Sequence, residues 1–167
     1  VEATFDNEVV DDVISAVRLV KSLPEIDSAR VYVLGHSLGG MLVPRIAQRA
    51  GEGCLGGIIS LAGPVRKMEQ LLTEQITYIS SLSGTQPDVK AAVEQVMNSL
   101  PESYRKMETE YQPVEVARML KLPFLVLQGE RDYQVTMQDF GMWRFGLYRN
   151  PNVLFKSYPK LNHALQE

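Results

Sequence analysis

A serine between glycines is the first residue of this sequence that could do chemistry. The pentapeptide Gly35 to Gly39, of sequence GHSLG, follows an apolar run from Ala29 to Leu34 and precedes a helix-forming segment. A serine on such a turn has a strained backbone, and its hydroxyl is exposed beside the free N–H groups of the helix. A glycine-rich turn can also bind phosphate. The strand before and the helix after favour a nucleophile at Ser37, with the N–H of Leu38 as one oxyanion donor.

A serine hydroxyl is a poor nucleophile at neutral pH and needs a base within hydrogen-bond reach. The chain contains two histidines, His36 and His163. His36 stands beside the serine on the turn, so we expect it to point away from the hydroxyl and not to act as the base. His163 lies in a loop after the apolar run 153–158, where it can reach over the carboxyl edge of a sheet. It is therefore the candidate base.

Two carboxylates follow the apolar run 123–128, and either could orient the base. Glu130 and Asp132 are two residues apart and carry the same charge. A carboxylate that accepts a hydrogen bond from the histidine ring fixes its tautomer and stabilises the imidazolium. The residues alone leave the choice between these two acids open.

The elements that must position these side chains alternate between strands and helices. We expect a helix capped by Asp6 or Asn7 and ending near Leu23, and another over 41–50. Short apolar runs predict four strands, at 29–34, 58–62, 123–128 and 153–158. Thr136 with Asp139 is expected to cap a further helix. This alternation predicts an α/β fold with a parallel sheet covered on both faces.

The sequence between residues 65 and 120 has no strand-like run. Amphipathic segments appear at 68–81, 88–100 and around 114–120, and residues 85–88 predict a capping box for the second. Helices inserted at the end of the sheet that carries the nucleophile indicate a cap. The expected division is a core of 1–63 and 121–167 with a cap of 64–120. Methionines and aromatics of the cap could line an acyl pocket or form helix core.

Composition excludes several classes of function. The 167 residues are 45% hydrophobic and 22% charged with a net charge of −3, as in an ordinary globular domain. There is no basic run and no apolar stretch that could span a bilayer, so we expect no nucleic-acid and no membrane partner. The single Cys54 rules out an intramolecular disulfide framework, and no metal or organic cofactor is implied. No signal peptide is visible, which favours a cytoplasmic location, although the native amino terminus is expected to lie outside this sequence.

Four motifs in this order resemble the α/β-hydrolase superfamily, in its esterase and dienelactone-hydrolase-like branch with a helical cap. They are GHSLGG, LAGP, LQGERDYQV and YPKLNH, each after one of the four expected strands. The resemblance implies a catalytic triad of Ser37, Asp132 and His163, and it favours Asp132 over Glu130, which becomes a solvated or structural carboxylate.

The chain departs from the family in its amino-terminal half. The superfamily sheet has about eight strands and takes its second oxyanion donor from a loop after an early one. This chain supplies four strands, so the resemblance implies a truncated fold. The run 29–34 would then be an exposed apolar edge that pairs in a homodimer or with the missing amino-terminal half.

These observations lead to three hypotheses of function. The first is a serine hydrolase that cleaves small-molecule carboxylic esters through an acyl-enzyme on Ser37. The second is a serine peptidase of the prolyl-oligopeptidase type. The third is a non-catalytic, self-associating fragment that lacks half of the oxyanion hole.

Overall fold

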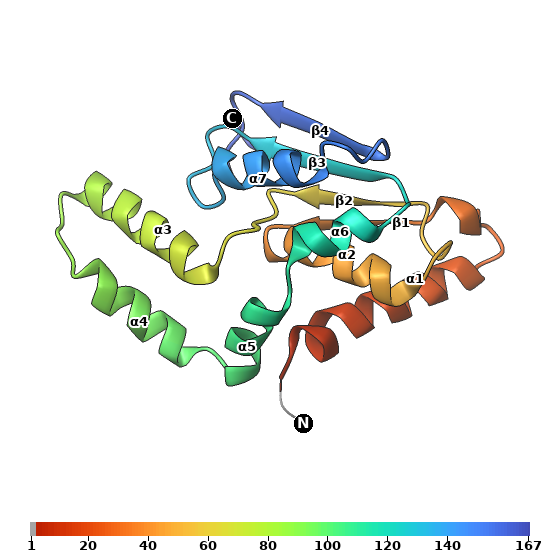
Figure 1. Cartoon of the computed structure of the whole chain (residues 1–167), viewed down its shortest axis with the longest axis horizontal. Coiled ribbons are helices and arrows are strands. Elements are labelled where there is room, and N and C mark those ends of the chain that lie inside the picture. The colour runs from red at the N-terminus through yellow and green to blue at the C-terminus, as the bar shows by residue number, and fades with distance from the viewer. Residues whose placement is uncertain (1–2) are drawn as a thin grey trace.

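Four short apolar segments form one parallel sheet. The structure, a computed structural model, describes residues 3–167, and its sheet has the order β1-β2-β3-β4 (Figure 1). The strands are β1 (Tyr32–His36), β2 (Gly57–Leu61), β3 (Phe124–Gly129) and β4 (Val153–Tyr158). The expected α/β class with a parallel sheet is confirmed. Because all strands are parallel, their carboxyl ends lie along the same edge.

The first strand begins later than the sequence predicts. Residues Ser28–Arg30 form a short 3₁₀ turn, η2, in which the carboxylate of Asp27 accepts a hydrogen bond from the N–H of Ala29. An acceptor side chain at this position stabilises a helical turn and not an extended strand. The predicted start at Ala29 is therefore wrong, and β1 runs from Tyr32 directly into the glycine-rich turn.

Helices cover one face of the sheet. They are α2 (Leu38–Ala50), α6 (Pro113–Met119) and α7 (Met137–Leu147), with α1 (Asp11–Ser22) and the π-helical turn η1 (Asp6–Val10) packed against α2. Their apolar side chains form one core with alternate residues of the strands, and Leu42, Ile58 and Trp143 are fully buried there. This core holds the carboxyl ends of the strands in fixed relative positions.

The opposite face of the sheet is open. Tyr32, Leu34 and Leu154, which alternate with buried residues along β1 and β4, are 55%, 56% and 68% exposed. Among residues 3–167 no helix lies on this side. The expectation that both faces are covered is therefore wrong for these strands, because all of the described helices that pack on the sheet share one layer.

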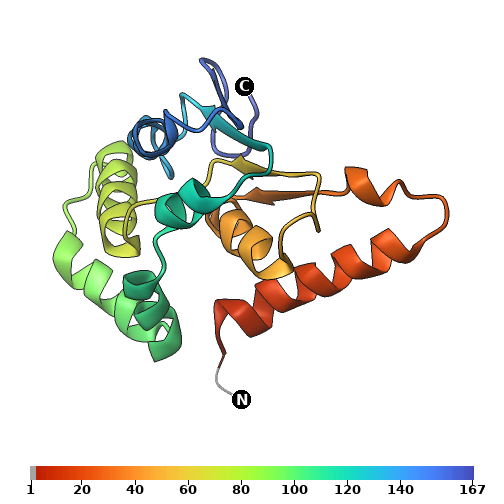
Figure 2. The ribbon, with the colours of Figure 1, turned by 45° about the vertical axis from the view of Figure 1, so that its right-hand side comes forward.

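Three helices in the segment between β2 and β3 project away from the sheet (Figure 2). They are α3 (Met68–Ser83), α4 (Val89–Ser99) and α5 (Glu102–Glu110). The predicted capping box does not form at Thr85; instead, Asp88 caps α4 by accepting a hydrogen bond from the N–H of Ala91 at 3.0 Å. Helix α5 was not predicted from the sequence, because this segment is rich in charged residues and shows no apolar repeat.

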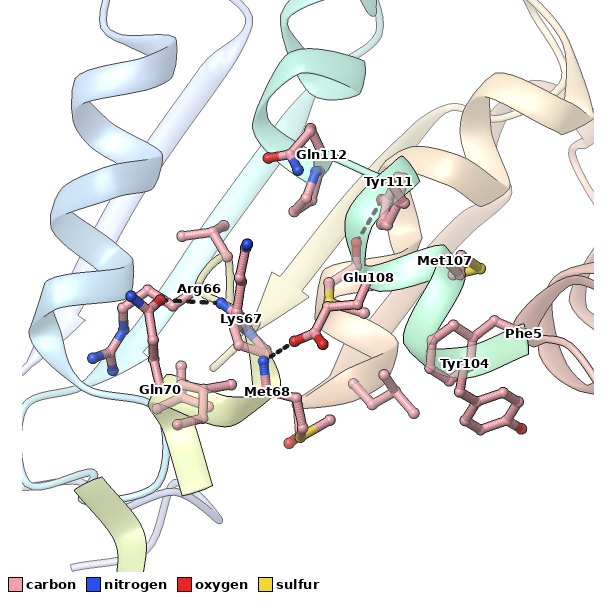
Figure 3. A pocket seen from close by; sticks show the side chains of 18 of the residues that line it. Phe5, Arg66, Lys67, Met68, Gln70, Tyr104, Met107, Glu108, Tyr111 and Gln112 are labelled. Carbon is pink, nitrogen blue, oxygen red and sulfur yellow. Dashed lines mark hydrogen bonds between the residues drawn. The ribbon is translucent and has the colours of Figure 1, made fainter. Parts of the chain in front are cut away.

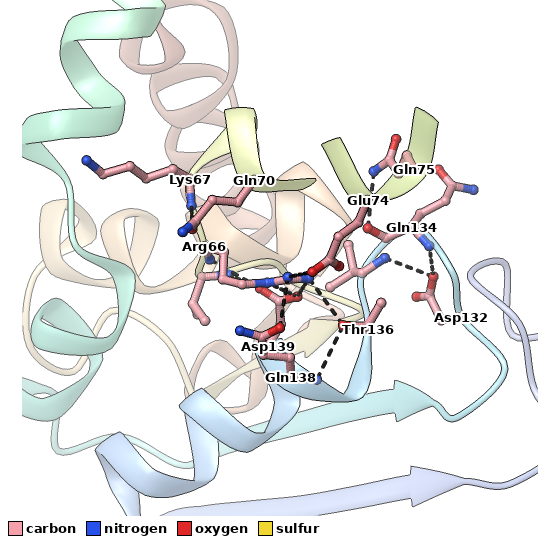
Figure 4. Close-up of polar contacts among 12 residues, drawn as sticks. Arg66, Lys67, Gln70, Glu74, Gln75, Asp132, Gln134, Thr136, Gln138 and Asp139 are labelled. Atoms are coloured by element: carbon pink, nitrogen blue, oxygen red, sulfur yellow. Dashed lines mark hydrogen bonds and ion pairs between the residues drawn. The ribbon is translucent and has the colours of Figure 1, made fainter. Parts of the chain in front are cut away.

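A buried ion pair attaches the start of this helical segment to α7 (Figure 4). Asp139, which is 0% exposed, accepts hydrogen bonds from the backbone N–H groups of Val65 and Arg66. The Arg66 guanidinium donates to Asp139 Oδ2 from Nη2 at 2.8 Å and from Nε at 3.0 Å, and Nη1 donates to Glu74 at 2.6 Å. Burial alone would lower the pKa of Arg66, but the hydrogen bonds to these carboxylates raise it. Asp139 thus forms the ion pair with Arg66 and does not take part in the expected cap, so Thr136 alone caps α7.

Replacing the buried acid should cost much stability. Asp139→Ala leaves a buried guanidinium with Glu74 as its remaining carboxylate, so we expect the free energy of unfolding to fall by about 3 kcal/mol or more. Urea unfolding measures this loss. Glu115→Ala is the matched control, because its pair with Arg118 is exposed and should be worth at most about 1 kcal/mol. Equal losses in the two variants would contradict the expected role of the buried pair.

Candidate active site

The turn between β1 and α2 holds Ser37 in a strained conformation. Its backbone has φ 55° and ψ −119°, a combination that a residue with a side chain rarely adopts. The Ser37 N–H donates to the carbonyl of Leu61 at 2.8 Å, which fixes the turn to β2. A Cβ on Gly35 would lie 2.1 Å from the carbonyl oxygen of Gly39, so glycine is required there. The strain therefore persists because neighbouring backbone confines the turn.

The structure brings the three expected site residues together. His163 Nε2 lies 3.0 Å from Ser37 Oγ, and His163 Nδ1 lies 2.7 Å from Asp132 Oδ2. Because an ionised carboxylate only accepts, the ring proton belongs on Nδ1, which leaves the Nε2 lone pair directed at the hydroxyl when the ring is neutral. Ser37 follows β1, Asp132 follows β3 and His163 follows β4. The aligned carboxyl ends of the strands thus place all three at one rim.

The carboxylate of Asp132 is fully buried and receives several hydrogen bonds. Its Oδ1 accepts from the backbone N–H groups of Gln134 at 2.8 Å and Val135 at 3.0 Å (Figure 4). Its Oδ2 accepts from the Gln128 amide at 3.0 Å in addition to His163. Glu130, the other candidate acid, is exposed and accepts from Ser157 Oγ at 2.7 Å. Of the two acids, only Asp132 is placed to orient the ring.

His36 contacts the loop that carries the base. As expected, it does not bond to Ser37; its Nε2 lies 2.8 Å from the backbone oxygen of His163, and the two rings are 4.7 Å apart. Since a carbonyl oxygen only accepts, His36 Nε2 donates. This contact was not predicted from the sequence, because nothing in the motif indicates where the loop after β4 returns.

A cavity of about 430 Å³ is lined in part by Ser37 and Leu38. Its walls come from the start of α2, from the segment around the start of α3, and from α5 with the loop that follows it. Most of the lining side chains are apolar, among them Phe5, Met41, Leu71, Tyr104, Met107 and Tyr111. Leu38 is the first residue of α2, so its N–H has no acceptor within the helix and can face the cavity.

One carboxylate lies in this largely apolar cavity. Glu108 on α5 accepts a hydrogen bond from the backbone N–H of Met68 at the start of α3 (Figure 3). Burial raises the pKa of Glu108, against the opposing effect of Lys67. The contact joins the two ends of the inserted helical segment.

The raised pKa of Glu108 predicts a pH-dependent stability. Below about pH 4 the Glu108 carboxyl is protonated in both the folded and the unfolded protein, so no charge is buried on folding. As the pH rises through the raised pKa of the folded state, burial of the charged form lowers the free energy of unfolding. Glu108→Gln keeps an acceptor for the Met68 N–H. We expect it to raise Tm slightly at pH 8 and to leave Tm unchanged at pH 4. Glu110→Gln, on the exposed side of the same helix, controls for net charge, and an equal gain at both pH values would refute the prediction.

Residues 3–167 hold neither a cluster of metal-binding side chains nor a helix that could span a membrane. No group of three or more histidine, cysteine, aspartate or glutamate side chains is placed to hold a metal ion. No helix in this range combines the length and apolarity needed to cross a bilayer.

Comparison with known proteins places the whole described chain in one family. Residues 3–167 match the model of the prolyl oligopeptidase family. Esterase EstD of Thermotoga maritima is 33% identical over 179 residues, which cover 97% of this chain and 41% of that protein. An uncharacterized peptidase, YtmA of Bacillus subtilis, is 26% identical over 137 residues, which cover 80% of this chain and 47% of that protein. The chain thus spans less than half the length of these curated relatives.

Solved structures agree on the fold. The esterase Pf2001 of Pyrococcus furiosus superposes with a TM-score of 0.62 at 15% identity, covering 96% of this chain and 56% of that one. At this identity the likeness concerns the fold alone. It confirms the fold class expected from the sequence, a parallel sheet of the α/β-hydrolase type of which this chain contains part.

Proposed function

The chain belongs to the prolyl oligopeptidase family, and from this premise we propose that it is a serine hydrolase that cleaves carboxylic esters through an acyl-enzyme on Ser37. The observation that carries the proposal is the hydrogen-bond chain from Ser37 Oγ through the His163 ring to the buried Asp132 carboxylate. A hydroxyl activated in this way attacks acyl carbonyls. The resemblance of the chain to an esterase supports the same class of reaction.

In the proposed reaction, Ser37 Oγ bonds to the carbonyl carbon while His163 Nε2 takes the hydroxyl proton. The resulting oxyanion accepts a hydrogen bond from the Leu38 N–H. When the carbon–oxygen bond to the alcohol breaks, the imidazolium returns the proton to the leaving alkoxide. Water then attacks the acyl-enzyme, His163 takes its proton, and release of the carboxylic acid restores the Ser37 hydroxyl. The Asp132 carboxylate accepts the Nδ1–H hydrogen bond and stabilises the imidazolium in both halves of the cycle.

The cavity beside Ser37 is the proposed site of the acyl group. Its walls are largely apolar, and a volume of about 430 Å³ lies in the usual range for small-molecule sites. The helical segment 64–120 supplies much of this wall, which supports its role as a cap over the site. An apolar acyl chain would bury its surface there while the ester carbonyl stays at the rim.

Labelling and turnover together test the proposal. A fluorophosphonate should form a covalent adduct on the peptide that contains Ser37, because only an activated serine reacts with it, and the full protein should hydrolyse p-nitrophenyl esters. His163→Ala should lose both properties. A protein that hydrolyses esters without labelling, or labels equally well in His163→Ala, would contradict the mechanism.

A peptidase is the second candidate, and the family itself favours it. One of the relatives bears the name of a peptidase. The same Ser37, His163 and Asp132 would cleave an amide, with the imidazolium protonating the leaving amine. Comparing kcat/KM for a p-nitrophenyl ester with that for a peptide p-nitroanilide separates the two, since a higher value for the peptide would reverse our ranking.

A further inference from the structure

A buried amide contacts the carboxylate that orients the base. Gln128 lies near the end of β3 and is 2% exposed. Its Nε2 donates to Asp132 Oδ2 at 3.0 Å, to the backbone oxygen of Gly129 at 3.1 Å and to that of Val135 at 2.8 Å. The amide nitrogen is therefore surrounded by three oxygen atoms.

The orientation of this amide follows from its partners. The carboxylate and the two carbonyl groups can only accept hydrogen bonds. If the amide were rotated so that its oxygen faced them, this buried oxygen would meet three other acceptors with no donor between them, which is costly. The nitrogen must therefore face Asp132, and its two N–H groups are shared among the carboxylate and the two carbonyl oxygens.

Gln128 bonds to the same carboxylate oxygen that accepts from His163. Oδ2 thus lies between two donors, while Oδ1 is held by the backbone of Gln134 and Val135. Four donors leave this buried carboxylate little freedom to rotate or to shift. We propose that Gln128 is a positioning residue of the hydrolase, one that fixes Asp132 Oδ2 where it can hold the His163 ring; this inference rests on the proposed function.

A purely structural role is the alternative. The bonds from Gln128 to Gly129 and Val135 also close the loop that carries Asp132. Such a role would change the stability of the protein and leave the turnover of folded molecules unaltered. The test therefore needs a measurement that reports on the His163–Asp132 bond directly.

The first variant is Gln128→Met, which keeps the length of the side chain and removes the donor. In the full protein we expect kcat for a p-nitrophenyl ester to fall about 10- to 100-fold, as a small misplacement of a catalytic group would cause, with KM unchanged. The low-field proton resonance of His163 Nδ1–H should shift, because its acceptor moves. Trp143→Phe is the control: it also removes a buried donor to a backbone oxygen, that of Gly63, but it should keep the kcat and resonance of the wild type.

The second variant, Gln128→Glu, should show a pH dependence of activity that a role in loop closure alone would not produce. The introduced carboxyl lies beside Asp132, and two carboxylates this close cannot both stay ionised, so they share a proton. While that proton is shared, a donor to Asp132 remains. Because His163 must be neutral to accept the Ser37 proton, the variant is compared with the wild type at each pH. We expect the ratio of its kcat to the wild-type kcat to fall as the pH rises and the shared proton leaves. This variant also serves if Gln128→Met does not fold.

The outcomes separate the inference from the proposed function. Wild-type kcat and an unshifted resonance in folded Gln128→Met, or a wild-type pH profile in Gln128→Glu, would overturn the role of Gln128. Absence of fluorophosphonate labelling at Ser37 in the wild type would instead refute the proposed hydrolase.

Discussion

Replacing Ser37 by alanine is expected to lower kcat/KM for a p-nitrophenyl ester by about 10⁴-fold or more. The substitution removes the atom that would bond to the acyl carbon, and His163 Nε2 then has no hydroxyl to deprotonate. The Leu38 N–H and the cavity remain, so residual hydrolysis by water can persist. Initial rates at low ester concentration measure the loss, and retention of more than a tenth of the wild-type rate would exclude Ser37 as the nucleophile.

Ser60→Ala is the matched control for this experiment. Ser60 lies on β2 opposite Gly35, is fully buried, and its Oγ has no hydrogen-bond partner among the described residues. Removing its hydroxyl should therefore leave both stability and kcat/KM close to the wild type. A comparable loss in Ser60→Ala would point to a disturbed turn and not to the chemistry of Ser37.

Asp132→Asn is expected to lower kcat by about 10⁴-fold while the protein stays folded. The amide oxygen can replace Oδ1 as acceptor for Gln134 and Val135, which places the new NH₂ group against two donors, His163 Nδ1 and the Gln128 amide nitrogen. Two donors cannot face each other, so the ring proton moves to Nε2, and a protonated Nε2 cannot accept the Ser37 proton. Circular dichroism checks the fold, and turnover of a p-nitrophenyl ester gives the loss.

Glu130→Gln is the control for the acid. Glu130 lies two residues before Asp132 in the sequence and carries the same charge. Its carboxylate accepts a hydrogen bond from Ser157, away from the His163 ring. We expect wild-type kcat in Glu130→Gln. If this variant were the inactive one, the assignment of the acid would have to be exchanged.

The sequence predicted those parts of the site that depend on local motifs. The glycine pattern around Ser37 is readable because close backbone contacts exclude side chains at fixed spacings. Asp132 and His163 could be placed because each follows an apolar run, and parallel strands end at one edge. Choosing Asp132 over Glu130 required the family resemblance, since spacing alone treats the two acids alike.

Features that depend on packing between distant segments could not be predicted. Gln128 reads as the last residue of an apolar run, and its role appears only once the loop folds back over it. The partner of Asp139 is Arg66, 73 residues away, so the sequence indicated a helix cap instead. Burial of only one face of the sheet also has no local signal, because strands with one or two covered faces can have the same apolar composition.

His163, the proposed base, follows an edge strand of the sheet. β4 pairs only with β3 in the described sheet, just as β1 pairs only with β2, but α2 packs against β1, so of the two edges β4 is the one more prone to local opening. Such a fluctuation would withdraw His163 from Ser37 while the turn after β1 stays folded. We therefore expect amide hydrogen exchange to be faster in β4 than in β2. We also expect that the fraction of molecules in which β4 is detached equals the fraction that is unable to react.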